Sequence, residues 1–326
     1  MQPRGLLAFP LTPFTSDDNV DTGVLAEHLD RQLSARQFGD DGVGQPSAWF
    51  IACGTGEFSA LSLGEFRTVV RTAVDVVAGR APVFAGTGGG PRQARDFADA
   101  AADAGADGLL LLPPYLVSST PAGLVDHVRY VASATPLPLV VYQRANAVLD
   151  PTSALALLDI PNVVGVKDGI GDVDAMSQLV ATVRTSDHPR AAEFAFLNGL
   201  PTAELSAPAY RAIGVENYSS AVLAFAPDIA VAFYGALARA DQEMLDKLLK
   251  HFYLPFAQLR NTVPGYAVAL VKAGARLSGL DVGPVRPPLV EPSAEHVDRL
   301  ARIIEEGRAV LADTTPVAAA ERGPVA

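Results

Sequence analysis

The chain has 326 residues, of which 49% are apolar and 19% charged, so it can bury one large core or two ordinary ones. Its formal net charge of −11 disfavours nucleic acid and anionic membrane surfaces as partners, because both repel an acidic protein. The only cysteine, Cys53, cannot form an intrachain disulfide, and no apolar run is long enough to span a membrane. With no signal-peptide pattern at the start, these features predict a cytoplasmic protein.

Short apolar runs alternate with helical patterns along most of the chain. The runs are rich in Val, Leu, Ile and Phe and are continuous, which is typical of parallel strands covered on both faces. We predict strands at Gly5–Leu11, Ala48–Cys53, Pro82–Ala85, Gly108–Leu112, Leu139–Tyr142, Val163–Lys167, Glu193–Leu197 and Gly214–Tyr218.

Helix-start signals follow several of these strands. Ser62 and Glu65 form a capping-box pattern, and Asp150 before Pro151 is an N-cap followed by proline at the first helical position. Pro91, Pro121 and Pro201 mark three further starts. Beyond the last strand we predict helices at Ala226–Arg239, Gln242–Thr262, Gly265–Ser278 and Ser293–Ala312.

Eight strand–helix units predict an α/β fold, a (β/α)₈ TIM barrel with appended C-terminal helices. We place the barrel at residues 1–222, the helices packed on it as part of the same unit at 223–312, and a frayed tail at 313–326. An open doubly wound sheet is the alternative. It usually carries a dinucleotide fingerprint, and Gly86–Gly90 only begins like one, with Pro91 at the third glycine position, so we interpret it as a turn.

The C-terminal ends of the strands carry the site in such a barrel. Lys167 closes an apolar strand, and desolvation there lowers the pKa of an ammonium, as an imine-forming amine requires. Snorkelling to the surface, or pairing with a carboxylate such as Asp168, is an equal alternative from position alone. The competing lysine, Lys272, lies in a helical pattern and is predicted to be structural.

Two further strand ends could serve the same site. The Tyr142 hydroxyl could meet the Lys167 amine and shuttle protons, although a buried, hydrogen-bonded tyrosine is the alternative. Gly54, Thr55 and Gly56 form a turn whose N–H groups suit a carboxylate, although the motif taken alone favours a plain tight turn.

Other chemistries find little support in the sequence. The five histidines are scattered without metal-ligand spacing and are predicted to be surface residues, so we predict no metal site. Neither a nucleophile elbow nor a phosphate-binding loop is present.

Taken together, the strand ends resemble those of the dihydrodipicolinate synthase / N-acetylneuraminate lyase superfamily. The likeness runs from Gly5 to about Leu300 and is carried by Phe9–Phe14, Gly54–Phe58, Leu111–Leu116, Val141–Arg144, Gly165–Gly169 and Tyr218–Val222. Two positions depart from the synthase branch. Gly54-Thr55 stands where that branch has a threonine pair, and Leu116 stands where it has a second tyrosine, so the chain is more similar to the dehydratase branch.

The resemblance implies a lyase that forms a Schiff base on Lys167, with Tyr142 as proton shuttle and no metal or organic cofactor. It implies a sugar diacid as substrate. One carboxylate would be held by Gly54, Thr55 and Gly56, with Gly199, Ser219 and Ser220 facing the distal part. Arg144 is a candidate clamp for the other carboxylate, or else a surface arginine. A homotetramer is also implied, although the changed residue at Leu116 weakens that inference.

Three alternatives stay open at this point. An aldolase of the same superfamily would cleave a 2-oxo sugar acid to pyruvate with the same lysine. A non-catalytic barrel would bind a sugar acid reversibly. A metal-dependent barrel lyase is a third possibility, less favoured because no metal-ligand pattern is present.

Overall fold

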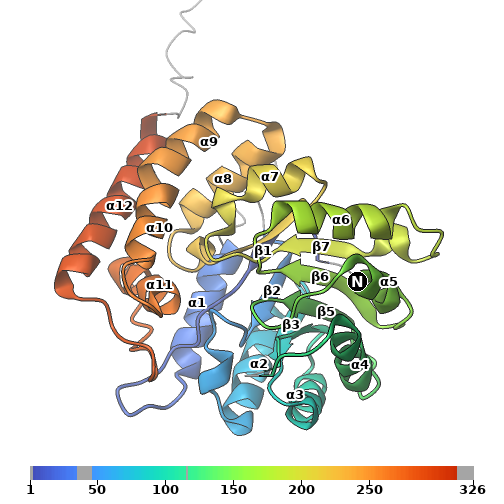
Figure 1. Cartoon of the computed structure of the whole chain (residues 1–326). Helices are drawn as coiled ribbons and strands as arrows, with labels where there is room; N and C mark the ends of the chain where they lie inside the picture. The colour runs from blue at the N-terminus through green and yellow to red at the C-terminus, as the bar shows by residue number, and fades with distance from the viewer. Residues whose placement is uncertain (1–2, 35–45, 115–116, 314–326) are drawn as a thin grey trace, which may run out of the picture.

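The computed structural model describes residues 3–34, 46–114 and 117–313 of the chain (Figure 1). Eight parallel strands pair in chain order, and the last pairs with the first, so the sheet is a closed barrel. The predicted (β/α)₈ fold is confirmed. The strands are β1 (Leu6–Ala8), β2 (Ala48–Ile51), β3 (Val83–Thr87), β4 (Gly108–Leu111), β5 (Leu139–Gln143), β6 (Val163–Asp168), β7 (Ala195–Asn198) and β8 (Asn217–Ser220).

One α-helix follows each strand and covers the outside of the barrel (Figure 1). These helices are α1 (Thr22–Ser34), α2 (Leu63–Val77), α3 (Pro91–Asp103), α4 (Pro121–Ala132), α5 (Pro151–Leu158), α6 (Val173–Arg184), α7 (Ala207–Ala212) and α8 (Pro227–Arg239). Short 3₁₀ turns lie beside them at η2 (Phe58–Ala60), η3 (Ala191–Glu193), η4 (Ala203–Leu205) and η5 (Val222–Ala224).

Most of the predicted helix starts are confirmed, and one is wrong. The capping box of Ser62 and Glu65 opens α2, and Asp150 caps α5 with Pro151 in the first turn. Pro201 does not open a helix. Thr202 takes a left-handed conformation with φ of 58°, and its carbonyl accepts a bond from Leu205, so the chain makes the turn η4 before α7 begins.

The C-terminal helices gather on one side of the barrel (Figure 1). They are α9 (Gln242–Leu248), α10 (Leu254–Arg260), α11 (Tyr266–Leu277) and α12 (Ala294–Asp313). The helix predicted over 242–262 is interrupted by one π-helical turn, η6 (Leu249–Tyr253), just before Pro255, which lacks the N–H that a regular helix needs. Of the predicted tail, residues 314–326 lie outside the described residues. Within the ranges described, none of the helices combines the length and apolarity needed to cross a bilayer.

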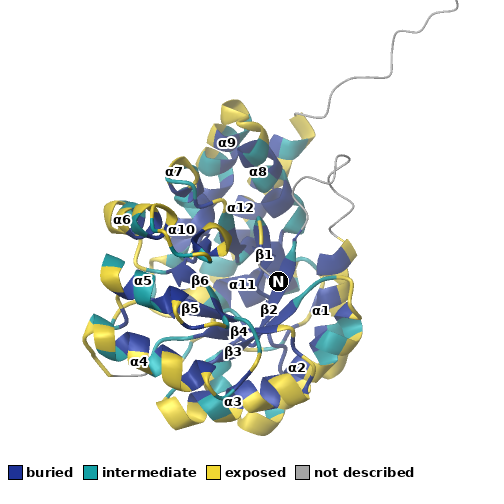
Figure 2. Cartoon of the chain, turned by 90° about the vertical axis from the view of Figure 1, so that its right-hand side faces the viewer, coloured by how far each residue is buried: buried dark blue, intermediate teal, exposed yellow. Residues whose placement is uncertain are grey.

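Two apolar cores result, one on each side of the barrel wall. The larger fills the space between strands and helices, where the helices turn their buried faces inward (Figure 2). The smaller fills the barrel itself and includes a stack of Phe9, Phe50 and Phe84, with neighbouring ring centres 4.8 Å apart. Lys167 lies next to this inner core, with its ammonium 5.1 Å from the centre of the Phe9 ring.

His28 corrects the prediction that the histidines are surface residues. Its side chain is buried in α1, where Nε2 accepts a hydrogen bond of 3.1 Å from the Leu11 N–H and faces the Gln32 amide. Burial, with a smaller effect of Arg31, lowers the pKa of His28 to about 3. The ring is therefore a neutral acceptor that ties α1 to the end of β1.

Candidate active site at the carboxyl ends of the strands

The pairing register decides which strand-end side chains enter the barrel. Side chains alternate between the two faces of a strand, and Lys167 pairs with Tyr142 on one side and Leu197 on the other. Tyr142 and Leu197 both belong to the inner core, so Lys167 shares their inward direction. Tyr142 and Lys167, which come from neighbouring strands, therefore meet inside the barrel mouth, as the sequence predicted.

Lys167 is desolvated and has no carboxylate partner within the described part of the chain. Its side chain is buried, with Nζ 3.8 Å from the centre of the Tyr142 ring and 3.2 Å from the carbonyl oxygen of Gly199. Burial holds the pKa of the ammonium below its ordinary value, and the interaction with the Tyr142 hydroxyl opposes this only in part. A lowered pKa supplies the free amine that attacks a carbonyl.

Asp168 lies on the other side of the strand, so it does not pair with Lys167. Its carboxylate accepts hydrogen bonds from the Gln143 amide at 2.8 Å, the Tyr210 hydroxyl, and the N–H groups of Ile170 and Gly171. These four bonds fix the end of β6 and the turn that follows it.

Tyr142 is placed to exchange protons with Lys167. Its hydroxyl donates to the Gly199 carbonyl oxygen at 3.1 Å, and Arg144 Nη1 lies 3.5 Å from the same hydroxyl. Burial alone would raise the pKa of Tyr142, but the positive charges of Lys167 and Arg144 outweigh it, and the pKa is lowered. Arg144 is exposed at the rim and reaches inward to this hydroxyl.

Two glycines leave room for these side chains. A Cβ on Gly199 would lie 2.3 Å from Lys167 Nζ, and a Cβ on Gly169 would lie 2.8 Å from the Tyr142 hydroxyl oxygen. The family resemblance implies that Gly199 faces the distal part of the substrate. The structure places it beside the amine, where its carbonyl accepts from both Lys167 and Tyr142.

The turn after β2 presents free backbone donors. Gly54 is exposed and Thr55 half-buried, and none of the N–H groups of Gly54, Thr55 and Gly56 donates to another described residue. The turn is fixed from below, because Thr12 Oγ1 donates to the Gly56 carbonyl oxygen at 2.7 Å. Successive free N–H groups in a glycine-rich turn suit an anion such as a carboxylate.

The two serines of β8 face opposite ways. Ser219 pairs with Leu7 of the inner core and lies on the inner face, where its hydroxyl is 3.4 Å from the Asn198 carbonyl oxygen. Ser220 lies on the helix-facing side, and its hydroxyl donates to Glu204 at 2.5 Å and accepts from the Leu223 N–H. Leu116 and Tyr115 lie outside the described residues.

Cys53 is a neighbour of Lys167 that the sequence analysis did not assign to the site. It belongs to the inner core with Tyr142, and burial, opposed by the Lys167 charge, raises the pKa of its thiol to about 12. It is therefore a neutral thiol in the inner core beneath the site. Its place at the end of an apolar strand was the signal that could have indicated this.

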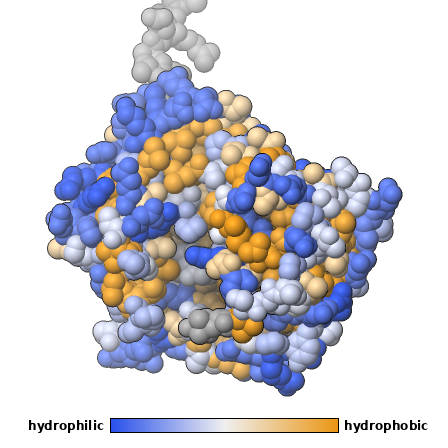
Figure 3. All heavy atoms as spheres, in the orientation of Figure 1, coloured by the Kyte–Doolittle hydropathy of each residue, from blue (hydrophilic) through white to orange (hydrophobic). Residues whose placement is uncertain are grey.

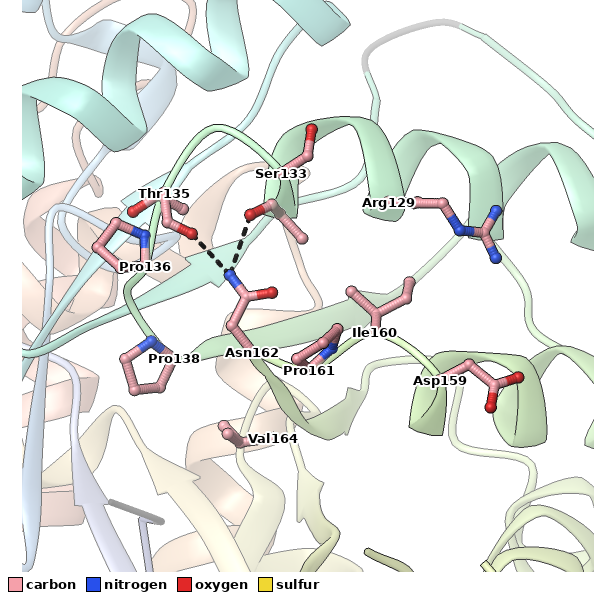
Figure 4. Close-up of a pocket in the computed structure, with 11 residues that line it drawn as sticks. Arg129, Ser133, Thr135, Pro136, Pro138, Asp159, Ile160, Pro161, Asn162 and Val164 are labelled. Carbon is pink, nitrogen blue, oxygen red and sulfur yellow. Dashed lines mark hydrogen bonds between the residues drawn. The ribbon is translucent and has the colours of Figure 1, made fainter.

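The molecular surface is hollowed at the end of the barrel where Lys167 and Tyr142 lie, as a binding site requires (Figure 3). The face in Figure 3 is hollowed near its centre, and side chains of mixed hydropathy surround the hollow. A different recess lies at the amino ends of β5 and β6, where the Asn162 amide donates to the carbonyl oxygens of Ala132 and Thr135 (Figure 4). Its charged side chains, Arg129 and Asp159, do not form a catalytic group.

Comparisons with known proteins identify the family. A profile of the dihydrodipicolinate synthetase family matches residues 2–307. A protein of Streptomyces griseus named probable 5-dehydro-4-deoxyglucarate dehydratase is 52% identical over 95% of this chain and 93% of its own. One of the same name from Rhizobium rhizogenes is 44% identical, over 94% and 96%. The chain belongs to the dihydrodipicolinate synthetase family.

Solved structures agree with this assignment. Dihydrodipicolinate synthase from Bacillus clausii superposes with a TM-score of 0.82 at 27% identity, covering 93% of this chain and 97% of that one. The synthase from Oceanobacillus iheyensis gives the same TM-score at 25% identity, covering 93% and 96%.

Proposed function

We propose that this chain is a decarboxylating dehydratase that converts 5-dehydro-4-deoxyglucarate to 2,5-dioxopentanoate, water and carbon dioxide. The observation that supports it best is Lys167, desolvated inside the barrel mouth with its Nζ against Tyr142. The relatives named probable 5-dehydro-4-deoxyglucarate dehydratase supply the substrate. The reaction needs an electron sink at the ketone, which a lysine imine provides.

The first half of the reaction forms the imine and removes water. Lys167 Nζ attacks C5 of the substrate, the ketone oxygen leaves as water, and a protonated imine forms. Loss of a proton from C4 gives an enamine. The enamine then expels the C3 hydroxyl, which takes up a proton and leaves as the water of dehydration, so the imine becomes conjugated with a C3–C4 double bond.

The second half releases carbon dioxide. The longer conjugated system accepts the electron pair of the C1–C2 bond, and C1 leaves as carbon dioxide. Protonation and tautomerisation turn C2 into an aldehyde, and water hydrolyses the imine to free Lys167. The water consumed there balances the water lost in imine formation, so the net products are one water and one carbon dioxide.

Each site residue has a role in this scheme. Tyr142 moves protons to and from the imine nitrogen and the ketone oxygen, since its hydroxyl shares an acceptor with Lys167 Nζ. The free N–H groups of Gly54 and Gly56, with Thr55, hold the C6 carboxylate beside the ketone. Ser219 faces the distal hydroxyls, whereas Ser220 supports the end of β8 through Glu204.

Arg144 is proposed to hold the C1 carboxylate until it leaves. Replacing it with alanine (Arg144→Ala) should raise KM about 10-fold or more, because a charge-assisted hydrogen bond to the substrate is lost. Steady-state kinetics measures this, with Arg129→Ala at the opposite end of the barrel as control. An unchanged KM would exclude the clamp.

Product analysis separates this proposal from its alternatives. Incubation with the diacid should release carbon dioxide and 2,5-dioxopentanoate in equal amounts. Pyruvate without carbon dioxide would instead identify an aldolase. Binding without any product would identify a sugar-acid-binding barrel. We also propose a homotetrameric, cytoplasmic enzyme from the family resemblance, to be checked by light scattering and cell fractionation.

A further inference from the structure

Lys272 and Glu57 form an ion pair that is almost wholly removed from water. The two side chains are 0% and 2% exposed, and Lys272 Nζ lies 2.7 Å from Glu57 Oε1. The ammonium also donates to the Pro284 carbonyl oxygen at 2.7 Å and lies 4.2 Å from the Phe14 ring centre. Lys272 comes from α11, so the pair joins a C-terminal helix to the turn after β2.

A contribution to the stability of the fold does not by itself explain a buried ion pair of this kind. Desolvating two charges costs much of what their attraction returns, and well-packed apolar residues often serve as well. Burial lowers the pKa of Lys272, and the charge and hydrogen bond of Glu57 are the main effects that oppose it. A role of the pair in positioning the backbone around Glu57 is therefore a better explanation than stability.

Glu57 closes the turn that contains the free backbone donors. It has a left-handed backbone with φ of 53°, which is unfavourable for a residue with a side chain, and its N–H donates to the Gly54 carbonyl oxygen at 3.2 Å. Its second carboxylate oxygen accepts from the Arg286 N–H at 3.0 Å. The side chain of Glu57 is thus fixed by α11 and the segment after it, while the N–H groups of residues 54–56 stay free.

We infer that Lys272 is a positioning residue that, through Glu57, holds the Gly54–Gly56 turn in the shape that binds the carboxylate beside the reacting carbonyl. The inference rests on the proposed function in one respect, that this turn holds a substrate carboxylate. Lys272 itself touches no substrate. Its loss should therefore reduce recognition of the carboxylate and leave the amine of Lys167 reactive.

Borohydride trapping of two small ketones tests this on the full chain. Pyruvate carries the carboxylate, and acetone has a methyl group in its place. Lys272→Met and Glu57→Gln should each reduce the preference for pyruvate over acetone at least tenfold, while acetone trapping on Lys167 stays within twofold. Lys247→Met is the matched control, since Lys247 pairs with Glu243 at 2.6 Å on the surface, and its preference should equal that of the unaltered protein.

If a single variant misfolds, the double variant Lys272→Met/Glu57→Gln still allows the preference for pyruvate to be measured. It leaves no unpaired buried charge, so the fold should recover. If Lys272 acts by positioning, the preference for pyruvate stays low in the folded double variant. Recovery of the preference along with the fold, or single variants that keep the full preference, would overturn the inference. A failure of the proposed dehydration would appear separately, as pyruvate rather than carbon dioxide released from the diacid by the unaltered protein.

Discussion

Lys167 and Tyr142 share one acceptor, the carbonyl oxygen of Gly199, at 3.2 Å and 3.1 Å. This shared contact holds the amine and the hydroxyl side by side before any substrate arrives. The pKa of each group is shifted downward, that of Lys167 by burial and that of Tyr142 by the nearby positive charges, which outweigh burial. Both shifts favour the passage of a proton between the amine and the hydroxyl, which imine formation requires.

Replacing Tyr142 with phenylalanine tests the shuttle. Tyr142→Phe keeps the ring against Lys167 and removes only the hydroxyl, so turnover should fall about 10²–10⁴-fold while the fold is unchanged. Turnover and circular dichroism measure the two effects. Tyr130→Phe is the control, because Tyr130 is an exposed residue of α4 under Arg95. Turnover within threefold of the unaltered protein in Tyr142→Phe would rule the shuttle out.

Gly199→Ala tests the crowding around the amine. The new Cβ would lie 2.3 Å from Lys167 Nζ and 2.8 Å from the Asp168 carbonyl oxygen, so the amine must move. Displacement by about 1 Å should slow imine trapping about 100-fold. Gly64→Ala, in the first turn of α2 with nothing within 4 Å of the new Cβ, should trap normally. Normal trapping by Gly199→Ala would contradict the geometry.

Strands are the element that the sequence predicts best here. Continuous apolar runs located all eight, because parallel strands buried on both faces need apolar side chains throughout. The polar ends of the runs located Lys167, Tyr142 and the turn after β2. Apolar runs do not reveal the register at a polar end. The sequence therefore does not distinguish Ser219 from Ser220, although the two side chains face opposite sides of β8.

Contacts between distant elements were beyond the reach of the sequence. Nothing in the helical pattern around Lys272 indicates that α11 packs against the turn containing Glu57. Pro201 predicts a helix start, but this local signal cannot reveal the left-handed Thr202 that follows it. The helical pattern predicts His28 on the surface, whereas it is buried and accepts a hydrogen bond from Leu11 in the segment after β1.

Asp168→Asn tests whether the outward-facing Asp168 of β6 supports only the fold, while the inward-facing Lys167 carries the chemistry. The variant weakens bonds from Gln143, Tyr210 and two backbone amides, so unfolding should require about 2 kcal/mol less, measured by urea denaturation. The pH dependence of imine trapping should stay unchanged, because Asp168 faces away from Lys167. A displacement of that profile by a full pH unit would instead indicate that the two residues interact.

At the scale of the whole molecule, two buried groups give opposite pH dependences of stability. Burial raises the pKa of Glu204 from 4.5 to about 7, against the hydrogen bond from Ser220 and the charge of Arg260. The folded state then binds the proton more tightly, so Glu204 lowers stability as pH rises through this range. His28, with its pKa lowered from 6.5 to about 3, acts in the opposite sense, and its contribution is lost as pH falls below 6.5.

Glu204→Gln should remove one of these opposing effects. The variant should be more stable than the unaltered protein above about pH 7, by up to on the order of 3 kcal/mol, and the difference should vanish near pH 4.5. Between about pH 4.5 and 6.5 its stability should rise with pH, because His28 alone then acts. Urea denaturation across this range measures both, and parallel profiles for the two proteins would refute the assignment.

Mass spectrometry after borohydride reduction with pyruvate tests whether Lys167 forms the Schiff base. We expect a single reduced adduct, which peptide mapping places on Lys167 and which disappears in Lys167→Ala. An adduct on another lysine, or no adduct with either pyruvate or the full diacid, would contradict it.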